Sequence, residues 1–112
     1  MANVYKNIQA VIDQAATNVA MYTVPEETTS IVKSIKLYNT HGSNLVVDII
    51  VYDASSTTDF EYDTVTVDSS GSVDLLTFNN VLILEAGDIL KMQTPTGNVV
   101  KMTASVLQTS RT

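Results

Sequence analysis

Short runs that alternate between apolar and polar positions, separated by turn-forming residues, are the dominant pattern of this chain. Residues 30–38 place mostly apolar side chains on one face of an extended strand and a mixed set on the other, and residues 45–52 start the pattern again. A repeat of two is typical of a β-strand with one buried face. Because the turn-forming residues 40–44 separate these two runs, the pattern predicts a hairpin.

Further runs extend this pattern over most of the chain. They are rich in Val, Ile, Thr and Tyr, which favour the half-buried surface of a sheet. These runs are residues 17–24, 60–67, 73–84 (which Asn79 and Asn80 interrupt), 89–93 and 99–107. About seven or eight short strands at this turn spacing are typical of an antiparallel sandwich or jelly roll. We therefore expect an all-β fold, either an antiparallel β-sandwich or a jelly roll.

The two ends of the chain give weaker signals. Residues 8–16 place apolar side chains on one helical face, while residues 4–12 also fit an edge strand, which the β-rich remainder favours. We expect a single β-sandwich domain over residues 1–112, because two cores would not fit in this length. Residues 1–14 are expected to form an N-terminal arm, and residues 108–112 a flexible polar tail.

Composition adds a reason to expect a partner. Hydrophobic residues make up 45% of the chain and charged residues 16%. The apolar fraction is ample for one core, whereas the charged fraction lies below the quarter that is usual in soluble domains. A short chain with so few charges is expected to have part of its uncharged surface covered by another subunit.

The net charge of −6, from 12 acidic and 6 basic residues, argues against two classes of partner. Lys33 and Lys36 are the closest basic pair, and Arg111 stands alone near the C-terminus. Nucleic-acid backbones and anionic membrane surfaces both require concentrated positive charge. We therefore expect no nucleic-acid partner and no membrane partner.

Two further observations concern where the protein is found. The longest apolar run, residues 45–51, is too short to cross a bilayer. The first eight residues do not have the basic and apolar blocks of a signal peptide. These features predict a protein that is made in a cytoplasm and is soluble there.

Residues that could perform catalysis lack the neighbours that catalysis needs. His41, the only histidine, lies in a Thr-His-Gly-Ser-Asn turn, and the chain has no cysteine. A catalytic histidine needs a nucleophile and an orienting acid around it. Glu61 and Asp63 share one face of a predicted strand, where like charges raise a pKa, but an ordinary solvated face explains them better. We expect no enzyme activity.

Oxygen ligands are plentiful enough to raise a calcium site as an alternative. Carboxylates flank several predicted loops, at Asp53, Asp59, Asp63, Asp68 and Asp88. Their spacing is not that of an EF-hand, so a loop cation at an assembly interface is the only version left open. Gly87 fits a hairpin turn with a positive φ better than a phosphate loop. We expect no cofactor and no metal.

Three segments carry a recognisable pattern. They are Tyr5-Lys6-Asn7, Tyr-Thr-Val-Pro at residues 22–25 followed by Thr-Thr-Ser-Ile-Val-Lys-Ser-Ile at residues 28–35, and Val-Leu-Ile-Leu-Glu-Ala-Gly-Asp-Ile-Leu at residues 81–90. This pattern resembles small virion structural proteins of tailed bacteriophages, especially those of marine and cyanobacterial phages. The resemblance covers about residues 5–107 and implies a β-sandwich without catalytic residues.

The function that this resemblance implies is structural. It points to a capsid decoration, or cement, protein on the capsid surface of the virion, which binds the lattice of the major capsid protein as a homotrimer and stabilises the head. One alternative is a component of the tail, neck, baseplate or fibre. Another is a glycan-binding module displayed on the virion, which the absence of tryptophan disfavours.

Candidate interface residues lie near the start of the chain and in two turns. They are Tyr5, Asn7, Tyr22, Pro25 and Gly87. Symmetric assembly covers exposed strand edges, and a short terminal segment can pair with a neighbour as an added strand. We therefore expect a homo-oligomer.

Overall fold

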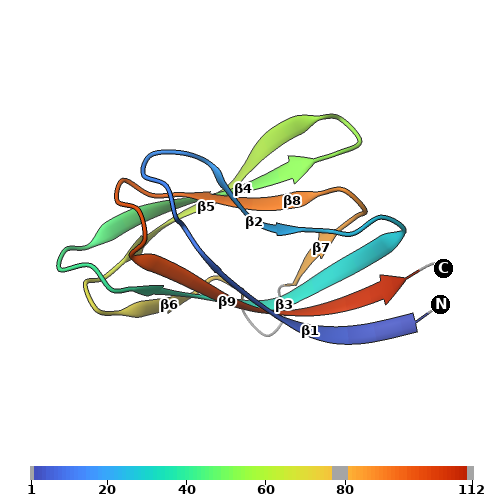
Figure 1. The fold of residues 1–112 in the computed structure, drawn as a ribbon, viewed down its shortest axis with the longest axis horizontal. Coiled ribbons are helices and arrows are strands. Elements are labelled where there is room, and N and C mark those ends of the chain that lie inside the picture. Colours follow the sequence, from blue (N-terminus) through green and yellow to red (C-terminus); the bar gives the residue numbers. More distant parts are fainter. Residues whose placement is uncertain (1, 77–80, 111–112) are drawn as a thin grey trace.

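Two antiparallel sheets stacked face to face make up the fold (Figure 1). The computed structural model describes residues 2–76 and 81–110. Within these residues the strands are β1 (Ala2–Val11), β2 (Val19–Thr23), β3 (Thr28–Asn39), β4 (Leu45–Asp53), β5 (Thr58–Val67), β6 (Ser72–Asp74), β7 (Leu82–Leu84), β8 (Ile89–Gln93) and β9 (Val100–Ser110). Sheet A has the order β1-β9-β3-β6, with β7 also paired to β3, and sheet B has the order β2-β8-β4-β5.

The order of the strands is that of a jelly roll. Strands β6 and β7 pair with successive parts of β3, at residues 36–38 and 30–32, and so act together as one interrupted strand. The chain then alternates between the sheets, with only β4 and β5 adjacent both in sequence and in space. Eight strand positions in two sheets match the double-sheet jelly roll. The expected all-β sandwich or jelly roll is confirmed.

The hairpin predicted from residues 30–38 and 45–52 is wrong. Strand β3 lies inside sheet A, with β9 on one side and β6 and β7 on the other, whereas β4 lies in sheet B. The buried amide of Asn39 supports the crossing between them. Its Nδ2 donates to the carbonyl oxygens of Ser43 (2.9 Å) and Val67 (3.0 Å), and its Oδ1 accepts from the His41 N–H (2.8 Å).

Both ends of the chain are more regular than expected. Strand β1 pairs with β9 without a register shift, from Ala2 opposite Ser110 to Val11 opposite Lys101. The N-terminal segment is therefore an edge strand of its own sheet, not a helix or a separate arm. Strand β9 continues to Ser110, so the predicted tail is paired over residues 108–110. Residues 111–112 and the break at Asn79–Asn80 lie outside the described residues.

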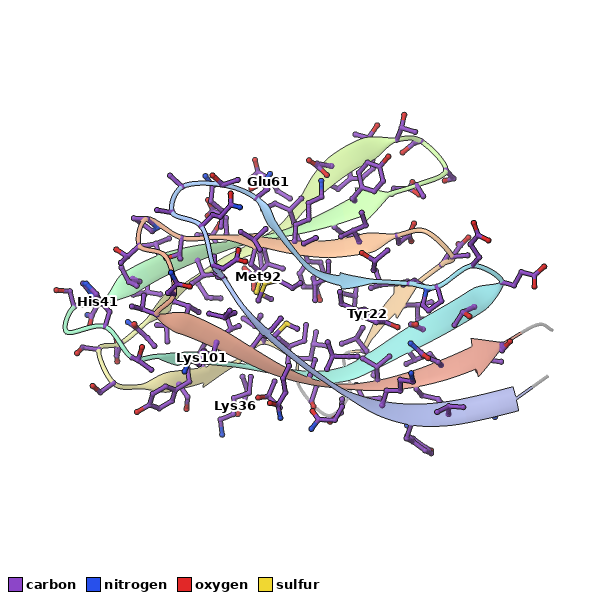
Figure 2. All side chains as sticks on the ribbon, viewed as in Figure 1. Tyr22, Lys36, His41, Glu61, Met92 and Lys101 are labelled. Atoms are coloured by element: carbon purple, nitrogen blue, oxygen red, sulfur yellow. The ribbon has the colours of Figure 1, made fainter. Side chains whose placement is uncertain are left out.

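Alternate positions on the strands supply one core between the sheets. Ile12, Leu37 and Met92 have no exposed area, and Figure 2 shows Met92 between the two sheets. Burying such side chains contributes roughly 1.5–3 kcal/mol each. The remaining members of the core are Met21, Tyr22, Val24, Val32, Ile35, Leu45, Val47, Ile49, Val67, Leu76, Leu84, Leu90, Val100, Met102, Ala104 and Val106.

The turn from β7 to β8 depends on a buried carboxylate. Asp88 accepts hydrogen bonds from the backbone N–H groups of Ala54 (3.0 Å) and Glu85 (2.9 Å), and so ties this turn to the end of β4. Gly87 beside it has the predicted positive φ, 85°. A Cβ at Gly87 would lie 3.1 Å from that of Ala54. The turn joins strands of different sheets and is therefore not the hairpin that the sequence suggested.

Replacing Asp88 by Ala should lower the free energy of unfolding by about 2–4 kcal/mol, because two backbone N–H groups lose a charged, buried acceptor. Chemical denaturation measures the change. Asp68→Ala, in an exposed loop, is the matched control and should change the free energy by less than about 0.5 kcal/mol. Equal effects of the two substitutions would contradict the role given to Asp88.

Removing the polar group of Thr94, unlike that of Asp88, is not expected to destabilise the fold. Its Oγ1 is buried and has no hydrogen-bond partner among the described residues. An unsatisfied buried hydroxyl costs about 1–3 kcal/mol, so Thr94→Val, which keeps the shape, should leave the melting temperature unchanged or raise it. Thr94→Ser keeps the hydroxyl and loses the methyl group, and should lower it. A clear loss of stability in Thr94→Val would mean that the hydroxyl has a partner in solution.

Candidate functional site

An exposed apolar row crosses the outer face of sheet A. Tyr5 on β1 lies opposite Leu107 on β9, Leu107 lies opposite Ile31 on β3, and Ile31 lies opposite Ile83 on β7. We call these four residues the outer row. Tyr5 is 74% exposed and Ile83 61% exposed, while the two residues between them are half-buried. Side chains in register on adjacent strands are close enough to form one continuous strip.

The strand alternation explains why this row points outward. The neighbours Val106, Val32 and Leu84 fill the core, so the adjacent side chains must point away from it. The rows on either side are polar but uncharged, and consist of Asn3, Thr109 and Thr29 on one side and Asn7, Ser105 and Ser34 on the other. The outer row therefore lies in a nearly uncharged strip of the sheet.

Lysines border this strip. The ammonium nitrogen of Lys33 lies 5.6 Å from the centroid of the Tyr5 ring, within cation–π range. Lys36 and Lys101 follow on β3 and β9, and Figure 2 shows both on the outer side of sheet A. Asp74, opposite Lys36, is the one acid at an outward strand position of sheet A among the described residues.

The outer face of sheet B has the opposite charge. Asp48, Asp59 and Glu61 border a groove of about 190 Å³ that also includes Ile50. Lys91 is the one basic residue among the described strand positions of this face. Its Nζ lies 3.0 Å from the Asp59 carboxylate and 4.8 Å from the centroid of the Tyr52 ring. Figure 2 shows Glu61 on the side of the molecule opposite Lys36 and Lys101.

The hairpin of β4 and β5 projects beyond the sandwich (Figure 1). Phe60 and Tyr62 on it are 53% and 38% exposed. A register shift places Ile49 opposite Asp63 but Ile50 opposite Glu61. Because consecutive residues of a strand face opposite ways and paired residues share a face, the two acids lie on different faces. The prediction that they share one is wrong, although both are exposed.

The other residues considered for catalysis or metal binding do not come together in one site. His41 Nδ1 accepts a hydrogen bond from the Ser43 N–H (3.2 Å) within its own loop. The hydroxyls of Ser55 and Ser56 donate to Asp53 and lower the pKa of its carboxyl. Across residues 2–76 and 81–110, no three His, Asp or Glu side chains are grouped so that they could hold a metal ion. Nor does this part of the chain contain a helix long and apolar enough to cross a membrane.

The five predicted interface residues divide into three groups. Tyr5 and Asn7 share the outer face of β1, two residues apart. Pro25 and Gly87 lie near each other at one end of the sandwich, where the Gly87 N–H donates to the carbonyl oxygen of Val24 (3.1 Å). Tyr22 does not belong on a surface, because the residue is only 9% exposed and packs in the core.

Tyr22 instead links the two sheets. From β2 in sheet B, its hydroxyl lies 2.7 Å from the Ser30 hydroxyl on β3 and accepts from the Gln108 side-chain amide (2.6 Å) on β9. Tyr22→Phe should therefore destabilise the fold by about 1–3 kcal/mol, because buried polar groups of sheet A lose their partner. Equilibrium unfolding measures this. Tyr38→Phe, at an exposed ring, should be neutral, and a neutral Tyr22→Phe would disprove the link.

The sequence did contain a signal for the outer row. Strands with one solvated face should not have adjacent apolar residues, yet Ile31-Val32 and Val106-Leu107 are adjacent, and residues 82–84 are apolar throughout. Such doubled positions indicate a strand that is apolar on both faces. A search for them would have found three of the four residues, whereas Tyr5 was found from its motif.

The fold is similar to those of two solved assemblies. A chain of the Bacillus endospore appendages, which form a family of disulfide-linked pili, has a TM-score of 0.62 and 14% identity, covering 98% of this chain and 89% of that chain. A chain of the virus-like particle of extra small virus, from the giant freshwater prawn Macrobrachium rosenbergii, has a TM-score of 0.54 and 14% identity, covering 96% and 79%. Likeness at this identity concerns the fold alone. No protein-family model and no curated protein matches the chain.

Proposed function

We propose that this protein is a structural subunit of a virus particle, and that its site is the outer face of sheet A. The observation that carries the proposal is the outer row, from Tyr5 to Ile83, in a nearly uncharged strip of sheet. Contiguous exposed apolar patches on small proteins mark sites of association. Exposing such a strip to water costs free energy, and this cost is removed when the flat surface of a partner covers the strip.

The folds of the two similar assemblies support a structural role. Both the spore pili and the virus-like particle are built from chains with this fold. The pili are disulfide-linked, whereas this chain has no cysteine, so disulfides cannot link its copies.

The more specific proposal is a capsid decoration protein of a tailed phage. It rests on the resemblance of the segments around Tyr5, residues 22–35 and residues 81–90 to phage virion proteins. In this role the chain binds the major capsid protein on the capsid surface and stabilises the head.

Copy number per virion tests this assignment. Quantitative mass spectrometry against the major capsid protein should give about one copy per capsid subunit. A few copies, or a few tens, would move the protein to the tail, neck, baseplate or fibre and contradict decoration. Absence from purified virions would contradict the structural role itself.

A substitution in the outer row tests the surface. Ile83→Ser should leave the melting temperature nearly unchanged, because the side chain is 61% exposed, yet it should reduce incorporation into particles several-fold. Phe60→Ser removes an exposed apolar side chain from the projecting hairpin and serves as the control. Equal incorporation of both variants would rule out the outer row as the docking surface.

A further inference from the structure

The two outer faces of the sandwich carry complementary ladders of charge. On sheet A, Lys33, Lys36 and Lys101 belong to three successive cross-strand rows, those of Ser105, Thr103 and Tyr38. Lys33 lies in the bulge beside the first of these rows. Successive rows on one face are two residues apart, a spacing of about 7 Å. The three lysines therefore follow one another along the strand direction, one in or beside each row.

The acids of sheet B follow the same spacing. Asp48, Glu61 and Asp59 belong to the rows of residues 48, 50 and 52 of β4, which are also successive. Each ladder contains one charge of the opposite sign, Asp74 on sheet A and Lys91 on sheet B. At these outward strand positions, three lysines and one acid therefore match three acids and one lysine.

We infer that the outer face of sheet A docks on the outer face of sheet B of a second copy of this chain. The lysine ladder of one copy meets the acidic ladder of the next. The outer row lies one row beyond the lysine ladder, and Val46, which is 46% exposed, lies one row beyond the acidic ladder, so the same contact places Val46 against the outer row. Charge complementarity of this kind fixes the register and orientation of two flat surfaces.

The charges also select against the alternative dimer. Two sheet A faces packed symmetrically would bring lysines against lysines, and two sheet B faces would bring acids against acids. Like charges at an interface disfavour the wrong pairing. The favoured contact is therefore head-to-tail, with different surfaces of the two copies in contact.

Head-to-tail contacts between opposite faces do not close on themselves. The two faces of a sandwich point in opposite directions, so each added copy leaves one basic and one acidic face free. The result is an open row of copies, which can run along a particle surface and link its neighbours. This contact deepens the proposed function and rests on it, since a second copy of the chain covers the outer face of sheet A, and only the copy at one end of a row presents that face to the particle.

A pair of charge-reversed proteins tests this contact. Lys36→Glu with Lys101→Glu makes both faces acidic, and Asp48→Lys with Glu61→Lys makes both faces basic. Neither variant should associate with itself. Mixed in equal amounts they should associate alternately, and raise the weight-average mass in sedimentation velocity at least twofold. Each reversal changes the net charge by four units from −6, so both variants stay acidic and net attraction cannot explain association.

Several results would overturn the inference. For the wild type they are a protein that stays monomeric at millimolar concentration, or one that forms only a closed trimer. For the variants they are a folded variant that associates alone as the wild type does, or a mixture of the two folded variants that stays monomeric. The control is Asp13→Lys with Glu26→Lys, which raises the net charge by the same four units as Asp48→Lys with Glu61→Lys, but at exposed loop positions. This control should associate like the wild type.

Folding of each variant is verified by its far-ultraviolet circular dichroism and melting temperature. Asp48 accepts a hydrogen bond from the Thr64 hydroxyl (3.1 Å), so its replacement carries the greatest risk to the fold. If that variant does not fold, Glu61→Lys with Thr64→Lys alters the same two rows at exposed positions. The mixing experiment is then repeated with this protein. Because it uses the purified chain, its result is independent of the copy number in virions.

Discussion

The contact between the two inner faces is the constraint on which the rest of the structure depends. Alternate apolar side chains leave water only when one sheet covers the other. Because most consecutive strands belong to different sheets, the chain crosses the gap repeatedly, and each crossing must satisfy its own backbone groups. Asn39 and Asp88 do so from buried positions, and Tyr22 joins the sheets through its hydroxyl. A few polar side chains therefore hold the apolar layers in register.

The sequence predicted the strands well and their pairing poorly, for one physical reason. A repeat of two is local, so it marks a strand, but a strand's partner depends on residues far away in the chain. Residues 30–38 and 45–52 fit a hairpin locally and belong to different sheets. Likewise, the register shift that separates Glu61 from Asp63 depends on the partner strand. Tyr22 was misplaced because tyrosine suits both surfaces and cores, and only its partners distinguish them.

Two outer faces of different chemistry follow from the same alternation. Once the inner positions are assigned to the core, the outer positions of β3 and β9 are free to carry apolar residues and lysines, while those of β4 and β5 carry acids. A net charge of −6 hides this division, because it averages over the two faces. The low charge content of the chain is likewise uneven, since the uncharged strip is concentrated around the outer row.

The pairing of β1 with β9 has a mechanical consequence. Ala2 lies opposite Ser110, so the two described ends of the chain leave the molecule side by side (Figure 1). Tension applied through both ends would break the hydrogen bonds between β1 and β9 one pair at a time, and breaking them in sequence needs little force. A load spread across the broad faces instead presses on the close-packed core between the two sheets, which is hardly compressible. The molecule is therefore weak against pulling at its ends and strong against compression between its neighbours.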